Sequence, residues 1–432
     1  MTINGIDESS ARKIIRALRK GLTPVEYAQN LFVGQARWFK TALKMMNDTA
    51  CDRDFEVRFL RAAYGGGKTM FLRCLESAAR NERWVSAYIV LRHEEKDEVQ
   101  LDKFNTIVAE VGRNIELPDG QHGISALLRA ALEALAGSVG YSVGGHNTLI
   151  TMAKAGDKVI EFCSSAKLDY GFTLAMQAAM HAMVDGDNAY INEIANWIGR
   201  GGDALIVDPA KLSYRPVPPQ TLAQPVHLKP VGLGSAEQLI RLLAFLAAAS
   251  GHKGLFLAID EIELIIGLSA RRRANAFQTL RALLEMRVHP PSTSLFLAAT
   301  PQMFEDPSMF PSYKALQDRI GDTTADRKIT FKEPVIDLDR TELTHEELKS
   351  LAEDIVLLYR AAGEEVENNA VNRLPELIDT VSSRRYVIAK PRLLCRCTVD
   401  LLDGNFGPQV SQVVATTSKK LEDERAKQIR GQ

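Results

Sequence analysis

The chain has 432 residues, of which 46% are hydrophobic and 25% charged, the balance of an ordinary folded protein rather than a disordered or fibrous one. This length exceeds the usual size of one domain, so we expect a core with a second lobe or a large insertion. A formal net charge of -1 excludes a chain-wide attraction to nucleic acid, although a local basic face stays open. No apolar run is long enough to span a membrane and the N-terminus lacks an export-signal pattern, which predicts a cytoplasmic protein without membrane contact.

The first 115 residues are predicted to form a helical cap followed by the start of an α/β core. Helical periodicity between residues 12 and 46 predicts the cap, which we place at residues 1–54. In residues 55–115, a β-rich strand from Glu56 runs into a glycine cluster, a helix leaves that cluster, and a second strand and helix follow from Trp84. Because strands that alternate with helices pair in parallel, we expect a parallel sheet.

Residues 116–234 break this alternation and are predicted to be an insertion. Alanine-rich segments with helical spacing begin at Ser125 and Tyr170, and a proline-rich stretch follows them. Apolar side chains at helical spacing usually form a packed core, so we expect a small helical bundle rather than a cofactor pocket. We predict that this bundle can fold on its own and that it recognises a partner rather than taking part in catalysis.

Residues 235–340 return to the α/β pattern. Ser235 and Gln238 have the spacing of a capping box for the helix that opens this half of the core. Two apolar strands follow, GLFLAIDEIE and SLFLAAT, with an arginine-rich helix between them. The segment RKITF from Arg327 is the candidate for the last core strand.

The remaining residues are predicted to form a helical lid and a polar tail. Thr344 and Glu347 have the spacing of a second capping box, at the start of an amphipathic helix. The lid spans residues 341–405 in this interpretation. Residues 406–432 are polar and charged, so they are expected to be a tail without a further domain.

A glycine loop with a lysine and a threonine follows the first predicted strand, with the sequence Ala62-Ala63-Tyr64-Gly65-Gly66-Gly67-Lys68-Thr69. Phosphate binding needs glycines that let backbone N–H groups converge, a lysine for the outer phosphates and a hydroxyl for magnesium. The loop supplies all of these at the start of a helix, where anions are favoured. Ala62 stands where glycine is usual, and its restricted backbone argues against tight or fast nucleotide turnover. A glycine-rich turn that ends in Lys-Thr by chance is the alternative.

Two adjacent acids end the apolar strand Leu255-Phe256-Leu257-Ala258-Ile259-Asp260-Glu261. Nucleotide hydrolysis needs a carboxylate for magnesium and usually a second one that orients water, and ligands of open α/β sheets bind at this edge of the strands. We therefore predict Thr69 and Asp260 as magnesium ligands and Glu261 as the residue that polarises water. Glu263 is expected to point elsewhere, on the loop or helix after the strand. A strand that simply meets a solvated turn is the alternative for the acid pair.

Other polar residues have positions that fit a nucleotide site, and each of them also has an ordinary structural interpretation. Thr300, at the end of the next apolar strand, fits a contact to the attacking water or the outermost phosphate, and equally a turn residue before proline. Arg319 precedes the predicted last core strand and Arg392 lies in the predicted lid, and each could instead be an ordinary surface arginine. Arg327 is the runner-up to Arg319.

This ordered set of motifs resembles the AAA+ ATPases, and within them the initiator-type clade that includes origin-recognition proteins. The resemblance covers residues 30–115 and 235–405 and leaves the insertion outside. It implies an α/β fold in which a parallel-sheet P-loop core carries a large helical insertion and a C-terminal helical lid. Val33-Gly34-Gln35 falls where this clade often has a Gly-Arg pair, so Gln35 is a departure from the pattern.

The resemblance also implies a role for each residue singled out above. Lys68 and Thr69 correspond to the Walker A motif, Asp260 and Glu261 to Walker B, Thr300 to sensor 1, Arg319 to an arginine finger and Arg392 to sensor 2. The expected cofactors are ATP and Mg²⁺. The expected nucleotide-binding residues are Tyr64, Gly65, Gly66, Gly67, Lys68, Thr69, Met70 and Arg392.

Within the clade, the glycine loop, the long insertion, LAIDEIE and the late Pro-Arg-Leu-Leu segment are similar to the P-loop ATP-binding proteins of bacterial BREX phage-defence systems, the BrxD-like group. That similarity implies an ATPase that binds ATP and ADP and drives or switches assembly of a defence complex. It also implies a homo-oligomer that acts on or near DNA beside a helicase or nuclease. A switch that binds ATP without hydrolysing it and a small-molecule phosphotransferase with an acceptor pocket in the insertion are the alternatives.

Overall fold

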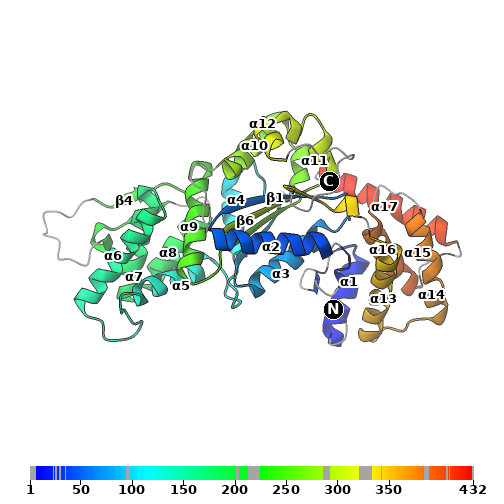
Figure 1. Ribbon diagram of the computed structural model, residues 1–432, viewed down its shortest axis with the longest axis horizontal. Helices are drawn as coiled ribbons and strands as arrows, with labels where there is room; N and C mark the ends of the chain where they lie inside the picture. Colours follow the sequence, from blue (N-terminus) through cyan, green and yellow to red (C-terminus); the bar gives the residue numbers. More distant parts are fainter. Residues whose placement is uncertain are drawn as a thin grey trace.

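The molecule is elongated, with a sheet at its centre and a helical region at each end (Figure 1). The insertion lies at one end and the lid at the other, and the first and last helices, α1 (Glu8–Arg19) and α17 (Val410–Arg430), both lie on the lid side. The computed structural model describes residues 6–22, 24, 27–28, 31–34, 36–93, 98–200, 204–212, 224–285, 292–320, 333–341, 343–383, 389–404, 407 and 409–430.

The central sheet of the described chain has 5 strands, all parallel, in the order β2, β5, β6, β1, β7. They span Phe55–Arg61 (β1), Val85–Val90 (β2), Leu255–Asp260 (β5), Thr293–Ala299 (β6) and Val335–Asp337 (β7). The predicted parallel sheet is confirmed, and all residues of β5 and β6 are buried, as expected for strands covered on both faces. Because β6 lies between β1 and β5, the segments that follow these strands meet at one edge of the sheet.

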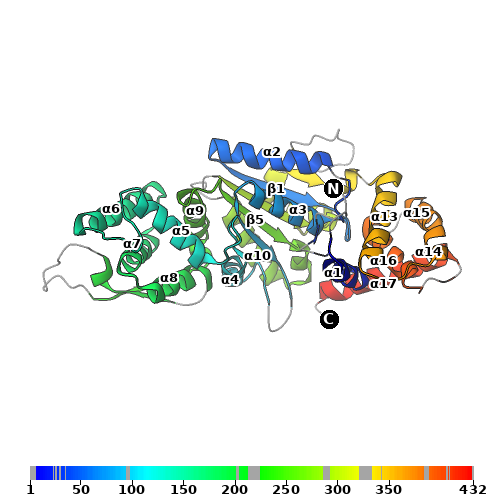
Figure 2. The same ribbon diagram turned by 90° about the horizontal axis from the view of Figure 1, so that it is seen from below.

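Helices cover both faces of this sheet. Their bounds are Ala36–Asp52 (α2), Lys68–Asn81 (α3), Phe104–Asn114 (α4), Ala236–Ala249 (α9) and Ala270–Leu284 (α10). Helices α2 and α3 share an apolar cluster with one face of the sheet, and α4, α9 and α10 share a cluster with the other. Figure 2 shows α2 and α10 on opposite sides of the strands. None of the helices that the structure describes combines the length and apolar character needed to cross a membrane.

The two predicted capping boxes have different outcomes. The box formed by Thr344 and Glu347 is confirmed, because each side chain bonds the backbone N–H of the other residue. The box at Ser235 is wrong: the chain enters α9 through a 3₁₀ turn, Leu233–Ser235, and the Ser235 hydroxyl makes no capping bond. The side chain of Gln238 instead accepts a hydrogen bond of 2.9 Å from the backbone N–H of Asp169 in the insertion.

The insertion is packed onto the core rather than standing apart from it. Its described part contains α5 (Ile124–Gly137), α6 (Leu149–Ser165), α7 (Tyr170–Asp185), α8 (Asn188–Arg200) and an antiparallel pair, β3 (Leu205–Val207) with β4 (Val226–Leu228). Its buried side chains form one continuous cluster with α4, α9 and the sheet. Helices α4 and α8 cross so closely that a Cβ added to Gly112 would lie 2.2 Å from the Gly199 carbonyl oxygen. Removal of the insertion would therefore expose apolar core.

The lid contains helices from both ends of the chain. It consists of α13 (His345–Ala361), α14 (Asn368–Asn372), α15 (Leu374–Ser383), α16 (Lys390–Leu402), α17 and α1. Figure 2 shows α1 beside α13 and α16, and its buried Ile14, Ile15 and Leu18 belong to the lid cluster. The predicted N-terminal cap is therefore divided, since α1 packs in the lid and α2 packs on the sheet.

The predicted polar tail is instead helix α17. Val410, Val414 and Leu421 are buried in the lid cluster, so a helix with polar faces keeps a narrow apolar stripe against α15 and α16. Helix α17 also contacts η5 (Ile262–Gly267), the 3₁₀ segment that follows the acid pair. The segment RKITF, predicted as the last core strand, and Gln35 lie outside the described residues.

Candidate functional site

The glycine loop joins the end of β1 to the start of α3, as the sequence predicts. Gly65 and Gly67 have φ angles of 80° and 93°, values that side chains with a Cβ rarely adopt. Gly66 is needed for space instead, because a Cβ there would lie 2.8 Å from the Cβ of Ala62 and 2.9 Å from the Ala63 carbonyl oxygen. At each of these three positions, the structure therefore explains why glycine is present.

Ala62 fits the loop without backbone strain. It is fully buried against the sheet, and its φ is not positive. The position where glycine is usual therefore does not need the freedom of glycine in this chain. The backbone argument against tight or fast turnover, which we drew from Ala62, does not hold.

Lys68 is buried at the base of the loop, with 6% of its surface exposed. Its Nζ donates a hydrogen bond of 3.1 Å to the Ala62 carbonyl oxygen and lies 3.6 Å from Oε1 of Glu263. Glu263 lies on η5, after the strand as predicted, but it is fully buried and faces the lysine, which the sequence analysis missed. The only signal in the sequence is its spacing of two residues from Glu261.

Asp260 lies at the end of β5 and connects the acid pair to the glycine loop. Its Oδ2 accepts hydrogen bonds of 2.6 Å from the Thr69 hydroxyl and 2.6 Å from the Tyr88 hydroxyl. Its Oδ1 accepts 2.8 Å from the backbone N–H of Glu261. Burial, together with the charge of Asp260, raises the pKa of Tyr88 well above its ordinary value, so this phenol remains a hydrogen-bond donor.

Tyr88 was not identified from the sequence. It lies in β2, the neighbour of β5, and Arg73 of α3 stacks over its ring at 3.4 Å from the centroid. A tyrosine inside an otherwise apolar strand is a weak signal, since tyrosine is common in strands. Its contact with the acid pair becomes visible only when the strand order is known.

Glu261 has a left-handed backbone conformation, with φ 63° and ψ 33°. This conformation is unfavourable for a residue with a side chain and often marks a functional position. Glu261 is among the residues that line the cavity described next, so this turn places the second acid of the pair at the cavity wall.

A cavity of about 490 Å³ lies between the glycine loop, the N-terminal segment and the lid. Every residue predicted to bind nucleotide lines it, namely Tyr64, Gly65, Gly66, Gly67, Lys68, Thr69, Met70 and Arg392. The N-terminal segment contributes apolar side chains that include Leu18, Leu31 and Phe32. This volume lies within the range of about 300 to 1,000 Å³ that is common for small-molecule sites.

The lid contacts the glycine loop directly. The guanidinium of Arg392 lies 4.3 Å from the centre of the Tyr64 ring, close enough for a cation–π contact. The backbone N–H of Ala389, just before α16, donates 3.1 Å to the Tyr64 carbonyl oxygen. Arg392 is therefore a residue of the site rather than a solvent-exposed surface arginine.

Thr300 follows β6 in the chain. Because β6 pairs with β1 on one side and β5 on the other, Thr300 is at the sheet edge between the glycine loop and the acid pair. It precedes the short helix α11 (Pro301–Glu305) and its hydroxyl makes no capping bond to that helix. The described lining of the cavity includes Glu261 but neither Thr300 nor Asp260.

The family model described as BREX system ATP-binding protein BrxC/D matches residues 6–213 and 223–409. The chain belongs to this family. No curated protein and no solved structure shows significant similarity to it. The match spans nearly the whole chain, and it confirms the resemblance to ATP-binding proteins of the BREX phage-defence system. The family description accordingly supports ATP as a ligand of this chain.

The arginine-finger role that the resemblance implies for Arg319 stays a prediction. Arg319 lies in α12 (Lys314–Ile320), but its side chain is not among those described, and Arg327 lies outside the described residues. Helix α12 precedes β7, so Arg319 lies before the last strand of the described sheet.

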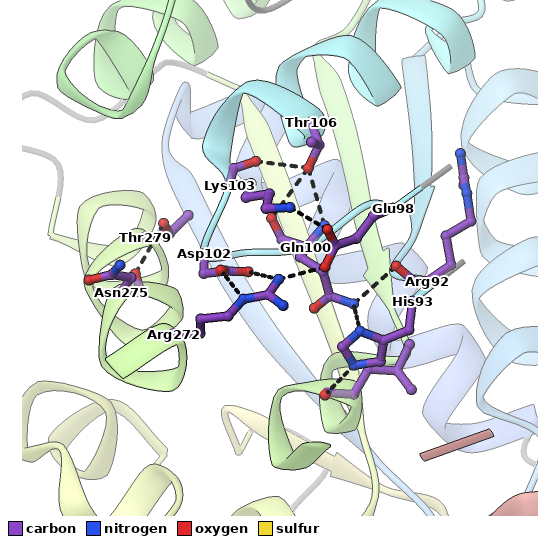
Figure 3. A network of polar contacts seen from close by, with 11 residues as sticks. Arg92, His93, Glu98, Gln100, Asp102, Lys103, Thr106, Arg272, Asn275 and Thr279 are labelled. Carbon is purple, nitrogen blue, oxygen red and sulfur yellow. Dashed lines mark hydrogen bonds and ion pairs between the residues drawn. The ribbon is translucent and has the colours of Figure 1, made fainter. Parts of the chain in front are cut away.

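A polar network joins the segment after the acid pair to the loop after β2 (Figure 3). His93 Nε2 bonds the Leu264 carbonyl oxygen of η5 at 3.0 Å, and its Nδ1 faces the Gln100 amide nitrogen at 3.1 Å. The Gln100 amide nitrogen is a donor, since it also donates 3.0 Å to the Arg92 carbonyl oxygen, and Nδ1 of His93 therefore accepts its hydrogen bond. Nε2 then carries the proton and donates it to the Leu264 carbonyl oxygen. Arg272 of α10 ties the same loop through Asp102. In this BrxC/D chain, the loop after β2 is thus fixed to both elements that follow the acids.

Proposed function

We propose that this BrxC/D chain is an AAA+ ATPase that hydrolyses ATP with Mg²⁺ and uses the nucleotide cycle to drive or switch assembly of a BREX defence complex. The observation that carries the proposal is the bond between Thr69 and Asp260, which brings together a hydroxyl and a carboxylate from separate parts of the chain beside the buried Lys68. Hydrolytic P-loop proteins use this combination for magnesium and the outer phosphates.

The residues present suit both ligands. Thr69 and Asp260 offer oxygen ligands, which magnesium prefers, and Lys68 offers a positive charge at the start of α3. When bound, Mg²⁺ neutralises charge on the phosphates. The Tyr88 hydroxyl would keep Asp260 oriented, and Glu263 would hold the Lys68 ammonium through their ion pair.

Glu261 is proposed to orient and polarise the attacking water. It lines the cavity, whereas Asp260 is buried with 1% of its surface exposed and is held by three donors, so the two acids have distinct environments. Thr300 is proposed as sensor 1, Arg392 as sensor 2 and Arg319 as the arginine finger of a neighbouring subunit.

The defence partners are proposed to dock on the insertion. Leu149 and Ile150, at the start of α6, have 76% and 70% of their surface exposed, which is unusual for side chains of this size. A helicase or nuclease of the same defence system is the proposed partner, with action on or near DNA. A small-molecule phosphotransferase is the second candidate; in the described part of the insertion, the buried side chains pack against the core.

The proposal is tested by measuring ATP binding and ATP turnover separately. Lys68→Ala should abolish binding of a fluorescent ATP analogue in a folded protein. Glu261→Gln should bind the analogue but hydrolyse ATP about 10²- to 10⁴-fold more slowly, the usual contribution of a general base. Glu353→Gln, which changes an exposed acid of α13, is the matched control.

Different failures have different meanings. Native turnover by Glu261→Gln would contradict the role of this acid. Binding without turnover by the native chain, alone and with its defence partners, would leave the nucleotide-dependent switch as the function. Retained binding by Lys68→Ala would contradict the site itself.

A further inference from the structure

A carboxylate outside the predicted motifs lies against the glycine loop. Asp339 is in η7 (Leu338–Thr341), the 3₁₀ segment that leads from β7 toward α13 of the lid. Its two carboxylate oxygens accept hydrogen bonds of 2.8 Å and 3.1 Å from the backbone N–H of Ala63. Asp339 is half-buried and lines the cavity. The Ala63 N–H is thus held by the segment that leads toward the lid.

The position of Asp339 is itself fixed. Its backbone N–H donates 3.1 Å to Oδ1 of Asp337, and the other oxygen of Asp337 pairs with Arg61, the last residue of β1. Arg61 and Ala63 therefore both bind this segment, one on each side of Ala62. The segment is also tied to α2, because Trp38 Nε1 donates 2.9 Å to the Thr341 hydroxyl.

An acid at this place opposes the binding of a polyphosphate. Burial raises the pKa of Asp339, whereas the hydrogen bond from Ala63 and the charges of Arg61 and Lys68 favour its ionised form. Like charges within a half-buried cavity repel each other more strongly than they do in water. None of the roles proposed above for ATP hydrolysis requires an anion here, so the contact with Ala63 is the observation from which a role for Asp339 can be argued.

The lid holds the loop at the next residue as well. Ala389, at the start of α16, donates its N–H to the Tyr64 carbonyl oxygen. Consecutive residues of the loop, Ala63 and Tyr64, are thus bound by the segment that enters the lid and by the lid itself. A change in the angle of the lid would pull on both.

We propose that Asp339 is a positioning residue, which fixes the start of the phosphate loop for ATP and couples it to η7, the segment that leads toward the lid. The proposal rests on ATP binding at this loop. In this proposal the carboxylate positions the loop by accepting the hydrogen bond from Ala63, and its negative charge weakens phosphate binding. The two properties can be separated, because asparagine keeps an acceptor oxygen and removes the charge.

The experiment compares Asp339→Ala and Asp339→Asn in the full chain, using a fluorescent ATP analogue. Loss of a hydrogen bond to a charged group corresponds to about a ten- to hundredfold change, so Asp339→Ala should bind the analogue about ten- to a hundredfold more weakly. Asp339→Asn should bind as tightly as the native chain or more tightly. Asp354→Ala, which removes a half-buried acid of α13 away from the cavity, is the control and should bind normally.

The readouts distinguish positioning from a purely structural role. A structural role would lower the melting temperature of Asp339→Ala without changing the affinity of the folded protein, and that result would overturn the proposal. Equal weakening by Asp339→Asn and Asp339→Ala would also overturn it, because the isosteric variant keeps the acceptor and should fold even if the alanine variant does not. Lys68→Ala separates the two proposals: if it loses binding while Asp339→Ala keeps it, only the positioning role fails.

Discussion

The left-handed backbone of Glu261 leads to a prediction in which two inactive variants differ in stability. A residue with a Cβ in this conformation costs roughly 1–2 kcal/mol relative to the right-handed form. Glycine avoids that cost but loses about 0.5–1 kcal/mol through its larger freedom in the unfolded chain. Glu261→Gly should therefore be more stable than Glu261→Ala by about 0.5–1 kcal/mol.

This comparison isolates the backbone, because neither variant has the carboxylate or any contact that it makes. The free energy of unfolding is measured by urea denaturation, and ATP turnover is measured on the same samples. Both variants should be inactive in hydrolysis, so the more stable protein is no better as an enzyme. Gln278, an exposed residue in α10, is the matched control. There the glycine variant should be less stable than the alanine variant by about 1 kcal/mol.

The reasoning would be refuted if Glu261→Ala were as stable as Glu261→Gly while the pair at Gln278 behaved as expected. The turn after β5 would then have no strain to release, and the position of the acid would need another explanation. Substantial ATP turnover in either variant would instead remove Glu261 from the mechanism, whatever the stabilities.

Other contacts can be tested in the same way. Tyr88→Phe removes a donor to Asp260, so urea unfolding should show a loss of about 1.5–3 kcal/mol, and ATP turnover should need more Mg²⁺; no change in either would exclude a role for the hydroxyl. The double variant Leu149→Asp, Ile150→Asp should no longer bind the BREX component that the native chain binds in a pull-down, and it should still bind ATP. Unchanged binding of that component would show that it docks on another surface. Arg319→Ala should bind ATP normally but hydrolyse it about 10³- to 10⁵-fold more slowly, and a phosphate-loop variant mixed with it should restore turnover at one composite interface; no effect would favour a monomeric switch.

Features carried by a few neighbouring residues could be predicted from the sequence. The glycine loop between strand and helix, the acids at the end of a buried strand and the capping box at Thr344 were all found where the sequence placed them. Each of these signals depends on spacing over fewer than ten residues, because local backbone geometry decides it. The order of the strands then brought the loop and the acids together.

Contacts between distant segments could not be predicted in this way. Tyr88 and Asp260 are separated by 172 positions, and Asp339 and Ala63 by 276, so no periodicity connects them. The error at Ser235 has a local cause, since a 3₁₀ turn before the helix removed the extended backbone that a capping residue needs. For α1 and α17, helical periodicity predicts only an apolar stripe, and it does not say which surface covers that stripe.

The glycine loop lies where two hydrophobic cores meet, which has a consequence for any ligand in the cavity. Ala62 and Phe71 belong to the core beneath one face of the sheet, whereas Tyr64 and Met70 pack against the core of the lid. A nucleotide bound at the proposed site would therefore lie beside both cores. A ligand that binds both parts stabilises the orientation that gives it the most contacts, and its free energy of binding includes that stabilisation. In the proposed site, the outermost phosphate that distinguishes ATP from ADP would lie next to Lys68 and the acids, so the two nucleotides are expected to favour different lid angles. Because α1 and α17 are built into the lid, both ends of the described chain would move with that angle.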